Sequence, residues 1–264
     1  MVTAAANCIA DTCQMTMMSL FKVPQRFAGN KGLAKHGGSK VQRQQHNNND
    51  NNNVQEPLEL FVPGRICLFG EHTDWAGGSF RPENDSIPIG MCMLSGTEEG
   101  LYARVSKNDK SGLKLHCTLD DGRQETAEYE WDDEVLLGVA QSGQHWSYVC
   151  GVALVMKQRY PQITGMVLDN YRTTLPVKKG LSSSAAVCVL TARAQLRLYH
   201  LHLTILQEMD YAFLGETTTP SKCGRMDQGC AYGPCQPIVM KFDGNNLSVE
   251  PLRVGGTIHV VIAT

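Results

Sequence analysis

The pattern of hydrophobic and polar positions becomes regular after residue 57. Short apolar or alternating runs predict strands at residues 58–62, 114–117, 127–131, 237–242 and 257–263. Apolar residues at helical spacing predict helices over residues 144–159 and 184–200. A third helix is predicted from Thr204 to about Leu214, because Thr204 and Gln207 form the sequence pattern of a capping box. This mixture of elements predicts an α+β fold for residues 57–264.

The first 56 residues differ in kind from the rest of the chain. Residues 42–53 are dominated by Asn and Gln and cannot bury enough apolar surface to offset their ordering entropy, so we expect a disordered linker. The stretch before it carries scattered lysines and a single acidic residue, Asp11. We expect an ordinary disordered leader on a cytoplasmic protein. Because that composition is also typical of a transit peptide, import into a plastid or mitochondrion is the alternative.

Composition excludes several classes of function. The chain has 24 basic and 26 acidic residues, a net charge of -2, which gives no electrostatic case for a nucleic-acid partner. No apolar run reaches the roughly 18 residues that suggest a membrane span. The ten cysteines are scattered, without a Cys-x-x-Cys pair or zinc-finger spacing. We therefore expect reduced, mostly buried thiols.

Residues 63–78 form the first segment with candidate chemistry. Arg65 interrupts an apolar run that leads to Glu71, His72 and Asp74, followed by two glycines. The acidic and imidazole side chains supply several hydrogen-bonding groups within four residues. Such a patch is suited to binding several hydroxyl groups of a ligand. A solvated polar turn is the alternative interpretation.

Residues 175–186 form the second segment. Gly180 and Leu181 precede three serines at the start of the predicted helix over residues 184–200. Small residues at a helix start expose backbone N–H groups, and the helix dipole favours an anion there. The serine hydroxyls can bond phosphate oxygens or Mg²⁺, and two lysines at 178 and 179 add positive charge. An ordinary serine N-cap is the alternative.

The third segment, residues 223–229, contains Asp227 and follows Glu216. An aspartate beside glycine and glutamine is most often a turn residue. Its interpretation as a catalytic group therefore depends on the other two segments.

Together the three segments resemble the GHMP kinases, and most closely the galactokinase branch. Residues 63–78 match the pattern P-G-R-x-x-L-x-G-E-H-T-D-x-x-G-G, residues 180–185 match Gly-Leu-Ser-Ser-Ser-Ala, and residues 223–228 match Cys-Gly-x-Met-Asp-Gln. The resemblance covers residues 58–264 and implies a two-layer fold like the second domain of ribosomal protein S5. GHMP kinases also have a C-terminal domain of ferredoxin-like fold. Nothing after Thr264 can supply it, so we expect this chain to be truncated before that domain.

The resemblance also implies the activity and the site. The implied enzyme is an ATP-dependent sugar kinase that uses Mg²⁺ and forms a sugar 1-phosphate. Asp227 and Arg65 are the implied catalytic residues, and Glu71, His72, Asp74 and Gly77 are implied to bind the monosaccharide. The implied ATP-binding residues are Gly180, Leu181, Ser182, Ser183, Ser184 and Ala185. Ser184 and Glu216 are the implied Mg²⁺ ligands.

Several positions depart from the galactokinase pattern. Trp75 replaces the usual Tyr, Ala76 replaces the usual Asn, and Arg225 replaces an apolar residue. An added guanidinium near the acceptor could favour an anionic sugar. Galactose, arabinose and glucuronate are therefore the candidate sugars. A non-catalytic sugar or ATP sensor on the same scaffold, or an inactive truncated copy, is the alternative function.

Overall fold

The computed structural model describes residues 56–76, 89–221, 223–244, 246–256 and 260. The chain divides into two units, residues 1–52 and 53–264, and all described residues belong to the second. Its strands are β1 (Leu58–Phe69), β2 (Gly90–Ser106), β3 (Gly112–Thr118), β4 (Gln124–Tyr129), β5 (Gly165–Thr173), β6 (Pro237–Asp243) and β7 (Asn246–Pro251). Its helices are α2 (Asp133–Gln141), α3 (Ser147–Arg159), α4 (Ser183–Leu198), α5 (Ile205–Thr217) and the short 3₁₀ helix η2 (Asp227–Tyr232).

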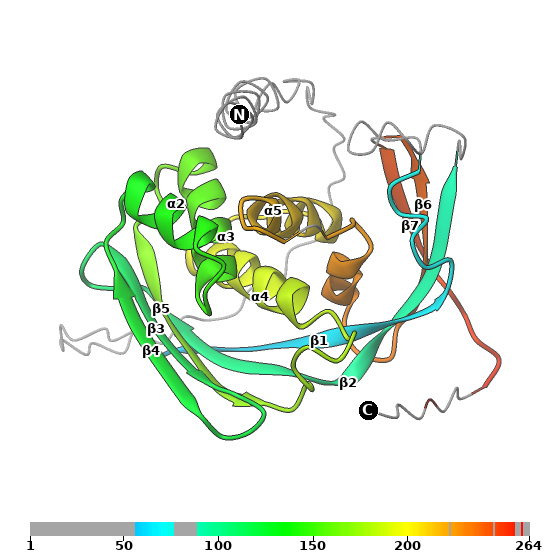
Figure 1. Ribbon diagram of the computed structural model, residues 1–264, viewed down its shortest axis with the longest axis horizontal. Coiled ribbons are helices and arrows are strands. Elements are labelled where there is room, and N and C mark those ends of the chain that lie inside the picture. Colours follow the sequence, from blue (N-terminus) through cyan, green and yellow to red (C-terminus); the bar gives the residue numbers. More distant parts are fainter. Residues whose placement is uncertain (1–55, 77–88, 222, 245, 257–259, 261–264) are drawn as a thin grey trace, which may run out of the picture. The chain divides into compact units, whose positions relative to one another are not determined.

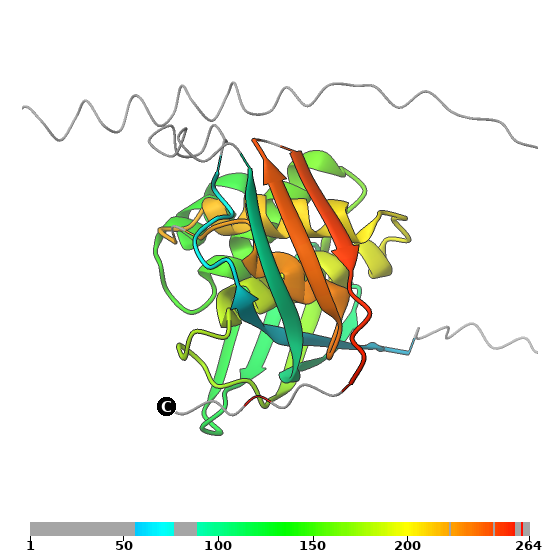
Figure 2. The ribbon, with the colours of Figure 1, turned by 90° about the vertical axis from the view of Figure 1, so that its right-hand side faces the viewer.

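The strands form one sheet in the order β4-β3-β5-β2-β6-β7, with β1 paired to β2 (Figures 1 and 2). All pairs are antiparallel except β3 with β5. The long strand β2 pairs with β6 through its first half, Gly90–Ser95, and with β5 through its second half, Leu101–Ser106. The register of β1 against β2 shifts between Pro63 and Arg65. Such an irregularity bends a strand and re-aims the following side chain, which here is Arg65.

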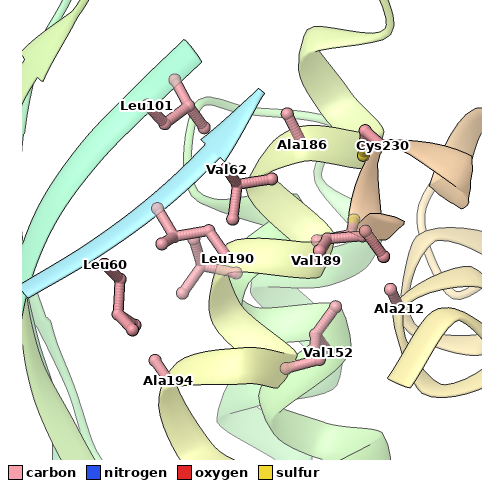
Figure 3. Close-up of a cluster of buried hydrophobic side chains, with 14 of the residues drawn as sticks. Leu60, Val62, Leu101, Val152, Ala186, Val189, Leu190, Ala194, Ala212 and Cys230 are labelled. Atoms are coloured by element: carbon pink, nitrogen blue, oxygen red, sulfur yellow. The ribbon is translucent and has the colours of Figure 1, made fainter. Parts of the chain in front are cut away.

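Helices α2, α3, α4 and α5 lie on one face of the sheet (Figures 1 and 2). Helix α4 is buried on most sides and is rich in alanine, which allows its backbone to approach its neighbours closely. Leu60 and Val62 of β1 lie beside Leu190 and Ala194 of α4 (Figure 3). This α4–β1 packing brings the start of α4 close to Arg65 of β1. In the described part of the chain, no helix combines the length and apolar character needed to cross a bilayer.

Most predicted elements are confirmed, and the α+β class is correct. The strands expected at 58–62, 114–117, 127–131 and 237–242 correspond to β1, β3, β4 and β6. The three predicted helices correspond to α3, α4 and α5, and the capping box at Thr204 is present. Strands β2, β5 and β7 and helix α2 were not predicted from the sequence. The strand expected at 257–263 lies outside the described residues except for residue 260, and the leader expected at 1–56 lies outside them except for residue 56.

Candidate active site

A cavity of about 670 Å³ brings the three motif segments together. Its polar lining includes Arg65, Glu71, Lys178 and Asp227, together with the serines at 182–184. Its apolar lining comes from β2, β3, β5, α3, α4 and neighbouring loops, and includes Leu101, Cys117, Leu119, Trp146, Val149, Leu168, Val177, Val187 and Leu190. A cavity of this size, largely apolar with a few convergent polar groups, is suited to a small-molecule ligand.

Arg65 and Asp227 form an ion pair in this cavity. Arg65 is placed by β1, and Asp227 is the first residue of η2. The Nε of Arg65 donates to Oδ1 of Asp227 at 3.0 Å, and its terminal nitrogen donates to the same oxygen. Burial lowers the pKa of Arg65, but the charges and hydrogen bonds of Asp227 and Glu71 outweigh burial, and the net shift is upward. The guanidinium is therefore held as a fixed positive charge.

The loop before α4 passes close to β1. The backbone N–H of Arg65 donates to the carbonyl of Leu181 at 3.1 Å. A Cβ at Gly64 would lie 2.8 Å from that carbonyl and 2.4 Å from the side chain of Leu175. Glycine is needed at Gly64 for this close approach. Gly180, with φ 78°, supplies the turn that leads the loop into α4.

Ser182 precedes α4 but does not cap it. Its backbone is left-handed, with φ 55° and ψ 47°, and its hydroxyl makes no capping hydrogen bond to α4. The hydroxyl instead donates to Oδ1 of Asp227 at 3.1 Å. The first backbone N–H groups of α4 are left without a side-chain cap, so they can serve an anion in the cavity. Lys178 also lines the cavity and adds positive charge beside them.

Glu216 lies beside the cavity at the end of α5 and is fully buried. Its carboxylate accepts from Gln228 at 2.8 Å and from Ser221 at 3.4 Å. Burial raises its pKa, which a hydrogen bond from Ser184 partly opposes. Ser184 lines the cavity, whereas Glu216 is not among the described residues that line it.

The described protein groups could supply only part of the coordination shell of a Mg²⁺ ion. No group of three or more His, Cys, Asp or Glu side chains within the described ranges could hold a metal ion. Mg²⁺ commonly takes one or two carboxylates and completes its shell with substrate phosphates and water. The neighbouring oxygens of Ser184 and Glu216 are compatible with that arrangement.

The expected sugar-binding residues are dispersed. Glu71 lines the cavity and lies 3.7 Å from Arg65. Asp74 is buried, accepts the backbone N–H of Met226 at 3.1 Å, and has its pKa raised by burial. His72 is exposed, with φ 63°, and its carbonyl accepts from Trp75. Neither His72 nor Asp74 is among the described residues that line the cavity, and Gly77 lies outside the described residues.

Two of the expected ATP-binding residues face the core. Leu181 and Ala185 are buried and are absent from the described cavity lining, whereas Gly180 and the three serines are part of it. Leu181 therefore contributes its backbone position, through the bond to Arg65, rather than its side chain.

Asn170 lines the cavity but was not predicted from the sequence as a site residue. Met166, Leu168 and Asn170 alternate as buried positions along β5, so a buried amide replaces an apolar residue there. Its Nδ2 donates to Thr173 at 2.8 Å, while its Oδ1 is buried without a partner within the described residues. An asparagine in the apolar register of a strand could have identified this position.

Arg225 does not line the cavity in the described part of the chain. Its guanidinium donates to the carbonyl of Gly244 at 2.6 Å and lies over the ring of Phe242 at 5.3 Å. Burial lowers its pKa, opposed by the charges of Asp74 and Asp210. This arrangement gives Arg225 a role in joining β6 to residues 223–229.

The chain is similar in sequence to known kinases. Residues 147–234 match the model of the GHMP kinases N terminal domain. The chain is 28% identical over 229 residues to a galactokinase of Haemophilus influenzae, covering 83% of this chain and 52% of the galactokinase. It is 30% identical over 174 residues to a galactokinase of Clostridium acetobutylicum, covering 64% of this chain and 39% of that protein. The chain thus spans about half the length of the first of these relatives.

Solved structures share the fold at low sequence identity. The galactokinase of Lactococcus lactis complexed with galactose has a TM-score of 0.58 and 22% identity, covering 75% of this chain and 47% of that one. The mevalonate kinase of Methanococcus jannaschii has a TM-score of 0.55 and 14% identity, covering 74% and 56%. These likenesses agree with the expected two-layer fold. The chain is therefore similar in sequence to galactokinases and, over residues 147–234, to the N-terminal domain of GHMP kinases.

Proposed function

We propose that the protein of this chain is an ATP-dependent sugar kinase that transfers the γ-phosphoryl group to a monosaccharide hydroxyl and forms a sugar 1-phosphate. The ion pair between Arg65 and Asp227 carries this proposal, because it lies in the same cavity as the serines that precede and open α4. In this arrangement the carboxylate provides a proton acceptor, and the neighbouring helix N-terminus provides a binding site for the phosphate groups.

Asp227 would accept the proton of the sugar hydroxyl. Its Oδ1 already takes the hydrogen bonds from Arg65 and Ser182, and no donor among the described residues reaches Oδ2. The sugar oxygen would form a bond to the γ-phosphorus as the bond from that phosphorus to the bridging oxygen of ADP breaks. Oδ2 would take the proton and return it to solvent after the product leaves.

The positive groups of the cavity would stabilise the phosphates. Arg65, Lys178 and the N-terminus of α4 present fixed charge and N–H donors to an anion. Phosphoryl transfer depends mostly on positioning and electrostatics, so such groups account for much of the expected catalysis. Mg²⁺ would be held by Ser184 and Glu216 with phosphate oxygens, and it would neutralise charge that develops on the phosphates.

The acceptor would be a monosaccharide of the galactose, arabinose or glucuronate class. Glu71 offers a carboxylate in the cavity, and Asp74 lies against Met226, the neighbour of Asp227. Polar partners of this kind favour a ligand with several hydroxyls over a largely apolar alcohol. Because Arg225 bonds to Gly244, its position offers no support for a negatively charged sugar, and neutral sugars should be tested first. Galactokinases among the relatives also favour a galactose-like acceptor.

Sugar-dependent release of ADP from ATP and Mg²⁺ tests this function. A panel of galactose, arabinose and glucuronate should identify the acceptor, and ³¹P NMR of the product should show a sugar 1-phosphate. Asp227→Asn should lower the rate by at least about 100-fold while retaining ATP binding. The exposed loop variant Asp109→Asn is the matched control and should retain activity. ATP binding without turnover for any sugar would contradict the kinase and favour a sensor.

A further inference from the structure

Ser182 holds a backbone conformation that is costly for serine. Its φ of 55° and ψ of 47° lie in the left-handed region, which glycine adopts far more readily than other residues. A residue other than glycine that is kept in such a conformation beside a candidate active site suggests that its side chain has a task there. The Ser182 side chain offers only a hydroxyl, so the contact of that hydroxyl indicates the task.

That hydroxyl is already engaged by Asp227 rather than by the helix. It donates to Oδ1 at 3.1 Å, and a hydroxyl has a single hydrogen to donate. It therefore cannot donate to a nucleotide phosphate while this bond is present. Ser183 and Ser184 also line the cavity, and none of the hydrogen bonds that Asp227 receives within the described ranges comes from them.

The hydrogen bond between Ser182 and Asp227 is one of several that link Arg65, the loop before α4 and Asp227 to one another. The backbone N–H of Arg65 donates to the carbonyl of Leu181, the residue before Ser182. The guanidinium of Arg65 and the hydroxyl of Ser182 then donate to the same oxygen of Asp227. Three donors on Oδ1 fix the orientation of the carboxylate and leave Oδ2 as the oxygen that can meet an acceptor hydroxyl.

We propose that Ser182 is a positioning residue that orients the carboxylate of Asp227, and that nucleotide phosphates are met by Ser183, Ser184 and the N-terminus of α4. This inference rests on the proposed kinase function, and it separates the first serine of the loop from the two that follow. The left-handed backbone aims the Ser182 hydroxyl at Asp227 and away from a capping position. The first turn of α4 therefore stays available to an anion.

Two substitutions at Ser182 distinguish a role in orienting Asp227 from a role in stabilising the fold. Ser182→Ala and Ser182→Gly both remove the hydroxyl, but glycine suits the left-handed backbone and alanine does not. Both variants should lower kcat for the sugar by about ten- to 100-fold. The dissociation constant for ATP, measured by calorimetry, should stay within about threefold. The urea midpoint of Ser182→Gly should exceed that of Ser182→Ala.

Ser183→Ala provides the comparison within the loop. It should weaken ATP binding more than either Ser182 variant does. The proposal is overturned if Ser182→Gly weakens ATP binding as much as Ser183→Ala while kcat at saturating ATP is unchanged, because Ser182 would then be a phosphate ligand.

A second measurement distinguishes failure of the proposed role of Ser182 from failure of the proposed kinase function. If the wild-type protein binds ATP but phosphorylates no sugar, the proposed function fails. The Ser182–Asp227 contact can still be tested by the urea midpoints of Ser182→Gly, Asp227→Ala and the double variant. Non-additive midpoints support the contact, and additive midpoints overturn it.

Discussion

The carboxylate of Asp74 occupies the space in which a side chain at Gly224 would begin. A Cβ at Gly224 would lie 1.7 Å from Oδ2 of Asp74 and 2.5 Å from its Cγ. The same Oδ2 accepts the backbone N–H of Met226 at 3.1 Å. Two motif segments that are about 150 residues apart in sequence are thus joined one residue before Asp227.

Gly224→Ala should therefore destabilise the protein and reduce activity. The added methyl group must displace a buried, hydrogen-bonded carboxylate, and overpacking of this kind costs about 1–3 kcal/mol. Urea denaturation measures this loss. Gly138→Ala is the control, because a Cβ at this exposed position of α2 would meet no atom within 4 Å apart from its chain neighbours and the backbone of its own helix. It should stabilise the helix by about 0.5–1 kcal/mol. Equal stability of Gly224→Ala and wild type would contradict the close contact.

Asp74→Asn should change how stability depends on pH. Burial raises the pKa of Asp74, so the folded protein holds this proton more tightly than the unfolded chain does. Its stabilising contribution is complete below the usual aspartate pKa and is lost as pH rises from there through the raised folded-state value. Asn can still accept the Met226 N–H but does not titrate. The free energy of unfolding should therefore rise more steeply with pH in the variant than in wild type.

Asp133→Asn is the comparison, because it should change the pH dependence of stability in the opposite direction. A hydrogen bond from Lys157 lowers the pKa of Asp133, so its contribution is present above the usual aspartate pKa and is lost as pH falls. This variant should show a shallower rise of stability with pH. Urea titrations between about pH 3.5 and 7 measure both slopes. A rise of stability with pH in Asp74→Asn that is no steeper than in wild type would refute the assignment for Asp74.

The sequence was enough to predict several of the residues that lie at the candidate site, but not how all of their side chains are oriented. The motif segments placed Arg65, Asp227 and the three serines at one site, and the cavity contains all of them. The orientation of Ser182 was not predictable, because a serine before a helix is ordinarily its cap. Only the three-dimensional approach of η2 to the loop shows that the hydroxyl bonds to Asp227 instead.

For two of the strands that were not predicted, β2 and β5, and for helix α2, the structure gives a physical reason. In β2, the polar residues Glu98 and Glu99 interrupt the alternation at the point where the strand changes partners from β6 to β5. In β5, Asn170 occupies a buried position that an apolar residue would normally mark. Helix α2 has only nine residues and follows β4 closely, which leaves little periodic sequence to recognise.

Thr204→Ala should destabilise the protein without changing the site. The Thr204 hydroxyl accepts the backbone N–H of Gln207 at 3.2 Å, and the Gln207 side chain accepts the N–H of Thr204 at 3.0 Å. Loss of such a cap costs about 0.5–2 kcal/mol. Thr204→Ser keeps the cap and should remain close to wild type in urea denaturation. ATP binding should be the same in all three proteins, and a loss of ATP binding in Thr204→Ala alone would contradict a local role.

Arg65→Lys should show that a positive charge alone does not suffice in the cavity. Lysine has one nitrogen and cannot reproduce the two guanidinium contacts with Asp227, whose side chain is 18% exposed against 9% for Arg65. We expect a loss of about 1–3 kcal/mol in the free energy of unfolding and about a 100-fold loss of sugar phosphorylation. Arg104→Lys is the matched control, because Arg104 and Glu59 form a pair whose side chains are more than half exposed. Exposed pairs contribute about 0–1 kcal/mol, so Arg104→Lys should change neither the free energy of unfolding nor sugar phosphorylation by much. Similar effects of the two substitutions would mean that the geometry of the Arg65–Asp227 pair contributes nothing beyond its charge.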